Sequence, residues 1–198
     1  MNYITSQFGN PRGLIGHLAG LIMAYENRAR NQWALSLLDI QPTDRILEIG
    51  FGPGWAIRQA SKVAVNGTVA GIDRSRTMVR QATIRNRTKV KSGHVILQHG
   101  TAARLPFDDR MFDKAYAVNS FHEWEDPVRG LQEIRRILFP AGHLLIVEHP
   151  HGAVNEQDIV AWSNQLASQL QDQGFESIQS FLRFIQGRTA VALSAQSP

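Results

Sequence analysis

Cysteine is absent from this chain of 198 residues. Its absence excludes disulfide bonds, thiolate metal sites, a cysteine nucleophile and cysteine-bound iron–sulfur clusters. Charged residues are also sparse, at 19%, while apolar residues make up 43%. This balance is typical of a soluble globular protein. A chain of this length is large enough to bury a core, and we expect a single domain over residues 1–198.

Long apolar runs are missing as well. The longest apolar stretch, residues 14–25, is interrupted by His17 and is shorter than the roughly 20 residues that a membrane-spanning helix needs. No early segment has the charged, apolar and small-residue zones of a signal peptide. We therefore expect a cytoplasmic protein with no membrane span.

Acidic residues are missing between Asp73 and Asp108, although the net charge of the whole chain is only +4. Basic residues concentrate in that interval: Arg74, Arg76, Arg80, Arg85, Arg87, Lys89, Lys91 and Arg104. Such a stretch is typical of a surface that meets phosphate or RNA. A solvated helix face has the same composition, and both interpretations stay open.

Short apolar runs alternate with helical patterns along most of the chain. We predict a helix in two pieces over 13–39, strands at 45–49, 68–73, 94–98, 112–118 and 143–148, and helices at 55–64, 76–87, 127–138 and 156–173. Two final runs, 177–185 and 189–193, flank Gln186-Gly187-Arg188 and predict a hairpin. This order predicts βαβ crossovers, a mainly parallel sheet, and one antiparallel strand from the hairpin. Ligands of such sheets bind beyond the carboxyl ends of the strands.

Residues 45–57 combine a buried strand, a glycine-dense turn and the start of a helix. Gly50, Gly52 and Gly54 allow a sharp turn and a close approach of backbone to a ligand. Glu48 adds a carboxylate at the end of the strand. We interpret the segment as a nucleoside-cofactor site, since helix N–H groups would point at the ligand.

The same turn does not suit a dinucleotide or a triphosphate. A dinucleotide motif needs a small residue where Trp55 or Ile57 stands. The Gly-Lys-Ser/Thr of a P-loop is absent, and Pro53 removes one N–H group that a pyrophosphate could use.

An ordered set of motifs resembles the class I S-adenosylmethionine-dependent methyltransferases. The motifs are Glu48-Ile49-Gly50-Phe51-Gly52-Pro53-Gly54, Asp73 after the second strand, Gly100-Thr101-Ala102-Ala103-Arg104-Leu105-Pro106-Phe107, Phe112-Asp113, and Leu138-x-Pro140-x-Gly142. The resemblance covers residues 40–150. Within the family, it is to the small-molecule methyltransferases of the type 11-like group. It implies a Rossmann-like sheet of seven strands with helices on both faces (40–198), preceded by an N-terminal helical lid (1–39).

The resemblance also implies S-adenosylmethionine as cofactor, with S-adenosylhomocysteine as product. The glycines would approach its methionine part and Glu48 its ammonium group, while Asp73 would accept from both ribose hydroxyls. Thr101 stands where the family has Asp, so its hydroxyl or the Ala102 N–H would hold the adenine. The cofactor residues implied are Glu48, Gly50, Phe51, Gly52, Gly54, Asp73, Arg74, Thr101, Ala102 and Asn119.

The stretch after the fourth strand, residues 119–124, holds the candidate catalytic groups. Methyl transfer to a hydroxyl or an acidic carbon needs a base near neutral pKa. His122 is the first candidate and Glu123 the second, although His122 also fits a packing role. Residues 148–151 lack the helical spacing of metal ligands, so we expect no metal.

With no separate recognition domain, the walls around the acceptor must come from residues 1–39, the segment after strand four and the 149–160 loop. The candidates are Met23, Tyr25, Asn27, Arg30, Trp33, Trp124, His149 and His151. Met23 and Trp33 also fit a buried core.

The favoured function is in-line methyl transfer to a small-molecule acceptor. An RNA methyltransferase using the basic 74–91 stretch is an alternative, but Asn119-Ser120-Phe121-His122 stands where many base-amino methyltransferases have Asn/Asp-Pro-Pro-Tyr/Phe. A non-catalytic S-adenosylmethionine-binding protein and a nicotinamide oxidoreductase are the others. The acceptor, the methylated atom and the choice between monomer and homodimer stay open.

Overall fold

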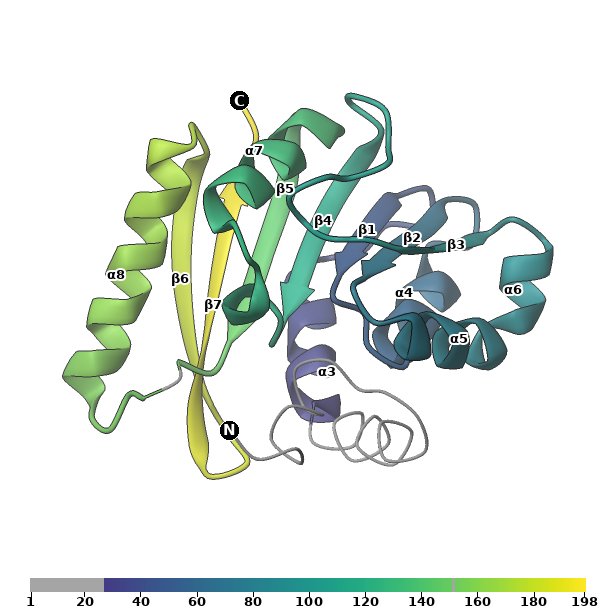
Figure 1. Cartoon of the computed structure of the whole chain (residues 1–198). Coiled ribbons are helices and arrows are strands. Elements are labelled where there is room, and N and C mark those ends of the chain that lie inside the picture. The colour runs from purple at the N-terminus through teal and green to yellow at the C-terminus, as the bar shows by residue number, and fades with distance from the viewer. Residues whose placement is uncertain (1–26, 151) are drawn as a thin grey trace.

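The protein is built on one sheet of seven strands, shown in Figure 1. The computed structural model describes residues 27–150 and 152–198. The strands lie in the order β3-β2-β1-β4-β5-β7-β6. Their bounds are β1 Arg45–Ile49, β2 Thr68–Asp73, β3 Val95–His99, β4 Phe112–Val118, β5 Leu138–Glu148, β6 Glu176–Ile185 and β7 Arg188–Gln196. Strands β1 to β5 pair in parallel and β7 is antiparallel to both β5 and β6, which confirms the predicted fold class.

Helices cover both faces of the sheet. They are α3 Arg28–Leu37, α4 Trp55–Val63, α5 Arg76–Arg85, α6 Arg87–Lys91, α7 Pro127–Ile137 and α8 Glu156–Asp172, with a 3-10 turn η1 at Phe121–Glu123. Buried side chains of α3, α4 and α5 form the core on one face, and those of α7 and α8 form the core on the other. The central strands are therefore buried on both sides, as parallel strands require, whereas the edge strand β6 is mostly exposed.

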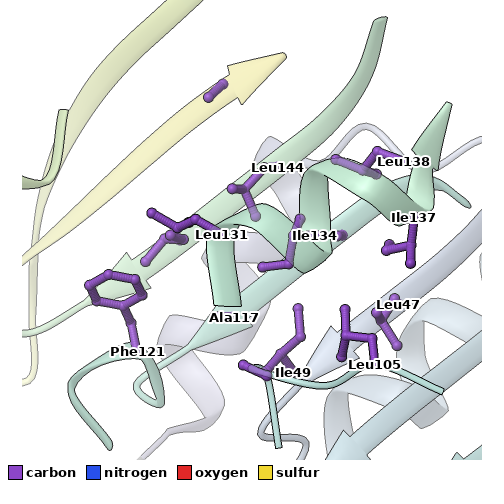
Figure 2. Packing of buried hydrophobic residues seen from close by; sticks show 14 of the residues in the cluster. Leu47, Ile49, Leu105, Ala117, Phe121, Leu131, Ile134, Ile137, Leu138 and Leu144 are labelled. Carbon is purple, nitrogen blue, oxygen red and sulfur yellow. The ribbon is translucent and has the colours of Figure 1, made fainter. Parts of the chain in front are cut away.

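Helix α7 illustrates how periodicity positions a helix. Figure 2 shows Leu131, Ile134 and Ile137 pointing from α7 toward the sheet, close to Ile49 of β1. These side chains recur every three residues, so they share one face. The helix begins where Asp126 accepts a hydrogen bond from the Arg129 N–H (2.9 Å) and Pro127 fixes the first turn.

The predicted helix 76–87 is interrupted at Asn86, which separates α5 from α6. The Asn86 side chain is buried and donates from Nδ2 to the Gly54 carbonyl (3.1 Å) and to the Ala82 carbonyl (2.9 Å). A single helix was therefore wrong here, because Asn86 ties the end of α5 to the glycine turn instead of continuing the helix. The predicted cap at Ser75 is confirmed, since its Oγ accepts from the Met78 N–H.

Strand β5 starts at Leu138, five residues before the predicted start at His143. The predicted helix 127–138 included Leu138, and residues 139–142 were predicted to lie between that helix and the strand. They pair with the end of the chain, where the Ala141 N–H donates to the Ser197 carbonyl (2.9 Å) and the Ser197 N–H to the Gly142 carbonyl (2.8 Å). A local sequence pattern contains no information on this distant partner.

Part of the predicted N-terminal lid, together with Met23, Tyr25 and His151, lies outside the described residues. The described part of the 13–39 helix is α3. Among the helices that the structure describes, none is both long and apolar enough to cross a bilayer.

Candidate functional site

A cavity of about 420 Å³ lies at the carboxyl ends of the parallel strands. It is lined by parts of the segments that follow β1, β2, β3, β4 and β5, together with Asn27, Arg30 and Arg188. Figure 1 shows the arrowheads of β1, β2 and β4 pointing toward this edge. Its size is that of a small-molecule site, and it lies where ligands bind in open α/β sheets.

The three glycines of the turn after β1 have positive φ angles but different surroundings. A Cβ atom on Gly50 would lie 2.4 Å from the Ser120 Cβ, and one on Gly54 would lie 2.6 Å from the Ala82 Cβ. A Cβ atom on Gly52 would meet nothing within 4 Å, because Gly52 lines the cavity. Gly50 and Gly54 thus permit close packing, whereas Gly52 leaves the space that a ligand can fill.

This difference separates two substitutions. We expect Gly52→Ala to fold with a loss of about 1–2 kcal/mol for the left-handed backbone and to weaken cofactor binding by narrowing the cavity. Gly54→Ala should mainly lower the melting temperature, since Ala82 and Asn86 must move. Thermal melts and calorimetric titration with S-adenosylhomocysteine measure the two effects. Equal cofactor affinity in Gly52→Ala and the wild type would contradict the assignment of Gly52 to the ligand-facing wall.

Asp73 fixes the same turn from the end of β2. Its Oδ2 accepts from the Gly52 N–H (2.8 Å) and its Oδ1 from the Ser75 N–H (2.8 Å). Burial raises the pKa of Asp73 to about 6, although these two N–H donors favour the charged form. Each carboxylate oxygen retains a second lone-pair site, so the group can still accept two ligand hydroxyls from the cavity that it lines.

Glu48 is buried and is not one of the described residues that line the cavity. It faces Tyr116 across the β1–β4 register, and the Tyr116 hydroxyl donates to its Oε2 at 2.8 Å. Burial raises the pKa of Glu48 to about 8, against the effect of the Tyr116 hydrogen bond, and the charge of Asp73 adds to the rise. A contact with a cofactor ammonium group therefore stays a prediction, and here the carboxyl group links two strands beneath the turn.

A chain of charged groups crosses the cavity wall from β2 to β5. Arg74 donates to the Glu123 carboxylate (2.8 Å) and to its backbone carbonyl (3.0 Å). Glu123 Oε1 lies 3.5 Å from His122 Nε2, and His122 Nδ1 lies 2.9 Å from Glu148 Oε2. Glu148 is 1% exposed and also accepts from the Phe121 N–H at 2.6 Å. The buried carboxylate thus orients the imidazole, with Nε2 on the Glu123 side.

The two carboxylates determine the charge of His122. Burial lowers its pKa, but the hydrogen bonds and charges of Glu123 and Glu148 outweigh this effect and raise it to about 9. The imidazole is consequently protonated at neutral pH in this arrangement. To accept a proton there, His122 must first lose the Glu123 contact, because that partner holds the proton on Nε2.

Asn119 follows the last residue of β4 in a left-handed conformation, with φ of 54°, which Asn tolerates better than most residues. Its Nδ2 donates to Asn27 Oδ1 (3.2 Å) and its Oδ1 accepts from the His149 N–H (3.4 Å). Asn27 Oδ1 also accepts from Arg30 (2.8 Å). The start of α3, the end of β4 and the end of β5 therefore meet at one side of the cavity.

Most predicted site residues converge on this cavity. Those that line it are Asn27, Arg30, Gly50, Gly52, Asp73, Arg74, Thr101, Ala102, Asn119, His122, Glu123, Trp124 and His149. Phe51, Gly54 and Trp33 are buried beside it and, within the described ranges, are not part of its lining. Trp33 packs in the core between α3 and the sheet, so the buried position that its pattern also allowed is the one observed.

Sequence reasoning missed Glu148, Tyr116, Ser120 and Arg188. Glu148 ends β5 and could have been found by the strand-end rule that identified Asp73. Ser120 stands in the 119–124 stretch, where its hydroxyl donates to the Ile49 carbonyl at 2.7 Å. Nothing in the sequence marks Arg188, which the hairpin brings to the cavity. Across residues 27–150 and 152–198 no cluster of three or more His, Asp or Glu residues fits a metal ion.

Residues 47–146, half of the chain, match the family described as "Methyltransferase domain". The chain belongs to this family. It is a class I S-adenosylmethionine-dependent methyltransferase. The matched range runs from β1 to β5 and thus spans the glycine turn, Asp73 and the 119–124 segment.

Known proteins similar to this methyltransferase agree with the family. The uncharacterized methyltransferase YdaC of Bacillus subtilis is 33% identical over 182 residues, which are 91% of this chain and 98% of that protein. The ubiquinone/menaquinone biosynthesis C-methyltransferase UbiE of a Geobacter species is 25% identical over 73% of this chain and 62% of its own length. The crystal structure of a SAM-dependent methyltransferase from Aquifex aeolicus superposes with a TM-score of 0.69 at 20% identity, over 85% of this chain and 89% of that chain, and so has the same fold.

Proposed function

We propose that this methyltransferase transfers the methyl group of S-adenosylmethionine to a small-molecule acceptor inside the 420 Å³ cavity. One observation carries the proposal. The cavity is lined by Gly52 and Asp73 on its β1–β2 side, and on its β4–β5 side by His122, which the buried Glu148 holds from behind. A cofactor and an acceptor bound there would meet inside a single enclosure.

The cofactor half suits a nucleoside with two adjacent hydroxyls and no phosphate. Gly52 leaves open space beside the Asp73 carboxylate, and that carboxylate can accept two more hydrogen bonds. Thr101 and Ala102 line the next part of the wall, where the adenine would lie. S-adenosylmethionine would supply a methyl group on a positively charged sulfur, and Asn119 would lie near the methionine end.

The acceptor half is formed by Asn27, Arg30, His122, Trp124 and His149. Alignment and exclusion of water are the main contributions that an enzyme makes to in-line displacement. Trp124 packs against Phe121, with ring centroids 4.8 Å apart, and shields this side of the cavity. His122, oriented by Glu148, would remove a proton from the acceptor with its Nε2 atom. Glu123 is the second candidate for this base. The quinone-biosynthesis relative supports a small acceptor of this kind.

The nature of the acceptor can be tested with cell extract as the substrate source. The protein would be incubated with methyl-labelled S-adenosylmethionine and with extract separated into small molecules, RNA and protein. We expect label to enter the small-molecule fraction, and we expect S-adenosylhomocysteine but not NAD to raise the melting temperature. Label confined to RNA would contradict the small-molecule proposal, and a thermal shift without labelling of any fraction would favour a non-catalytic binding protein.

A further inference from the structure

Helices α3, α4, α5 and α6 expose a surface that carries only positive charge. The four helices contain no Asp or Glu. Figure 1 shows α4, α5 and α6 side by side, and α3 contacts α4 on the same face of the sheet. Their basic residues outside the cavity form what we call the basic face: Arg28, Arg58, Lys62, Arg76, Arg80, Arg85, Arg87, Lys89 and Lys91.

The basic face differs in its ion pairing from several other basic residues of the protein. Arg74, Lys114, Arg129 and Arg136 each form a salt bridge with a carboxylate. Within the part of the chain that the structure describes, no residue of the basic face does. Among the described residues, no carboxylate lies within salt-bridge distance of these charges, so they attract solvent ions that a polyanionic partner would release or replace.

The side chains also lie close enough to repel one another across helix boundaries. Burial and the nearby guanidinium groups of Arg58 and Arg28 lower the pKa of Arg85, and burial and Lys62 lower that of Lys89. Arg28 lies 6.0 Å from the centre of the Trp55 ring, and Lys89 donates to the Ser61 carbonyl of α4. These contacts bring Arg28, Arg58, Lys62, Arg85 and Lys89 together across all four helices.

Aliphatic side chains are exposed among these charges. Ile84 of α5 is 61% exposed, and Val63 and Val65 at the end of α4 are 48% and 58% exposed. Ile84 follows Arg76 and Arg80 at intervals of four residues, so the three share one stripe of α5. Positive charge interspersed with exposed aliphatic groups is the composition of surfaces that lie on anionic membranes.

We infer that the basic face is a docking surface for an anionic lipid bilayer. A nucleic acid is the other polyanion with complementary charge, but the four helices carry no exposed aromatic side chain on which bases could stack. Trp33 is buried, and Trp55 is partly buried and contacts the Arg28 guanidinium with its ring. Exposed aliphatic groups gain no favourable contact with the phosphates of a nucleic acid, whereas they can insert into the interface of a bilayer.

Vesicle binding tests this inference on the full chain. We expect sedimentation with vesicles of phosphatidylcholine containing about 30 mol % phosphatidylglycerol, and at least about tenfold weaker binding to pure phosphatidylcholine. Binding should fall as salt rises from about 50 to 500 mM, since the Debye length shortens severalfold. No binding to the anionic vesicles at low salt would overturn the inference.

Two variants locate the surface. The double variant Arg58→Glu/Arg85→Glu should bind the anionic vesicles at least about 20-fold more weakly, because each basic residue near the surface contributes about fivefold. The control variant Arg104→Glu/Arg183→Glu makes the same charge change at two exposed residues outside the basic face, one after β3 and one in β6. It should lose less than about fivefold in vesicle binding, because its residues do not contact the bilayer. An equal loss in both variants would overturn the placement on α3–α6. Melting curves verify that each variant is folded.

A third variant separates lipid from nucleic acid. Ile84→Ser keeps every charge and should weaken vesicle binding about fivefold, since an aliphatic group no longer enters the interface. Anisotropy with a labelled single-stranded RNA should be weak and unaffected by this change. If RNA binds more tightly than the vesicles and Ile84→Ser behaves like the wild type in both assays, the partner of the basic face is a nucleic acid and not a bilayer.

Discussion

Asp73→Ala is expected to weaken the binding of S-adenosylhomocysteine at least about 100-fold. Two hydrogen bonds from ribose hydroxyls to a charged carboxylate contribute about 1.5–3 kcal/mol each, and each 1.4 kcal/mol is a factor of ten. The substitution also removes the acceptors of the Gly52 and Ser75 N–H groups, which hold the turn. Calorimetric titration measures the dissociation constant directly.

The same carboxylate gives cofactor binding a pH dependence. Only the ionised form can accept from both hydroxyls, and the pKa of Asp73 is raised to about 6. Affinity should thus be constant above about pH 7 and about tenfold lower near pH 5, where the folded protein binds a proton at this site. The Asp73→Ala variant should lack this dependence.

Asp172→Ala, at the exposed end of α8, is the matched control for loss of one acidic residue. Melting curves without ligand separate a damaged turn from a lost ligand contact. A dissociation constant in Asp73→Ala equal to that of the wild type would eliminate the ribose assignment.

His122→Ala should lower turnover by about 10² to 10⁴-fold, the usual contribution of a positioned general base. Cofactor affinity should be unchanged, since His122 lies on the acceptor side of the cavity. Initial rates with the acceptor identified from extract, together with calorimetry, give the two quantities. His143→Ala, at an exposed position within β5 and away from the cavity lining, is the control. Wild-type turnover in His122→Ala would remove His122 from the mechanism.

The pH profile distinguishes a base from a residue that only packs. A base acts in its neutral form, so a pKa near 9 predicts kcat/KM that rises up to tenfold per pH unit below pH 9 and then levels off. Glu148→Gln keeps an acceptor for Nδ1 but removes one negative charge that favours the imidazolium. In this variant, the rise of kcat/KM with pH should therefore shift to lower pH by about one unit or more. Superimposable profiles would show that His122 does not titrate in the reaction.

Local sequence patterns predict the elements of the fold but not the contacts between distant elements. The alternation of apolar runs and helical patterns predicted the elements along the chain and a mainly parallel sheet, because periodicity is a local property of the chain. The order of the strands within the sheet came only from the structure. The glycine turn and Asp73 were recognisable for the same reason, since a strand end is visible in the sequence. The break at Asn86 was not, because it depends on the Gly54 carbonyl 32 residues away.

The sequence by itself determined a Rossmann-like sheet, a cofactor turn without phosphate contacts, and an excess of positive charge after Asp73. Only the tertiary structure decided that Glu148 orients His122, that Arg74 holds Glu123, and that Arg28, Arg58 and Arg85 form one surface with α6. Each of these contacts joins residues that are far apart in the chain. Their distances are determined by strand register and helix packing, which result from the burial of the whole core rather than from any single segment.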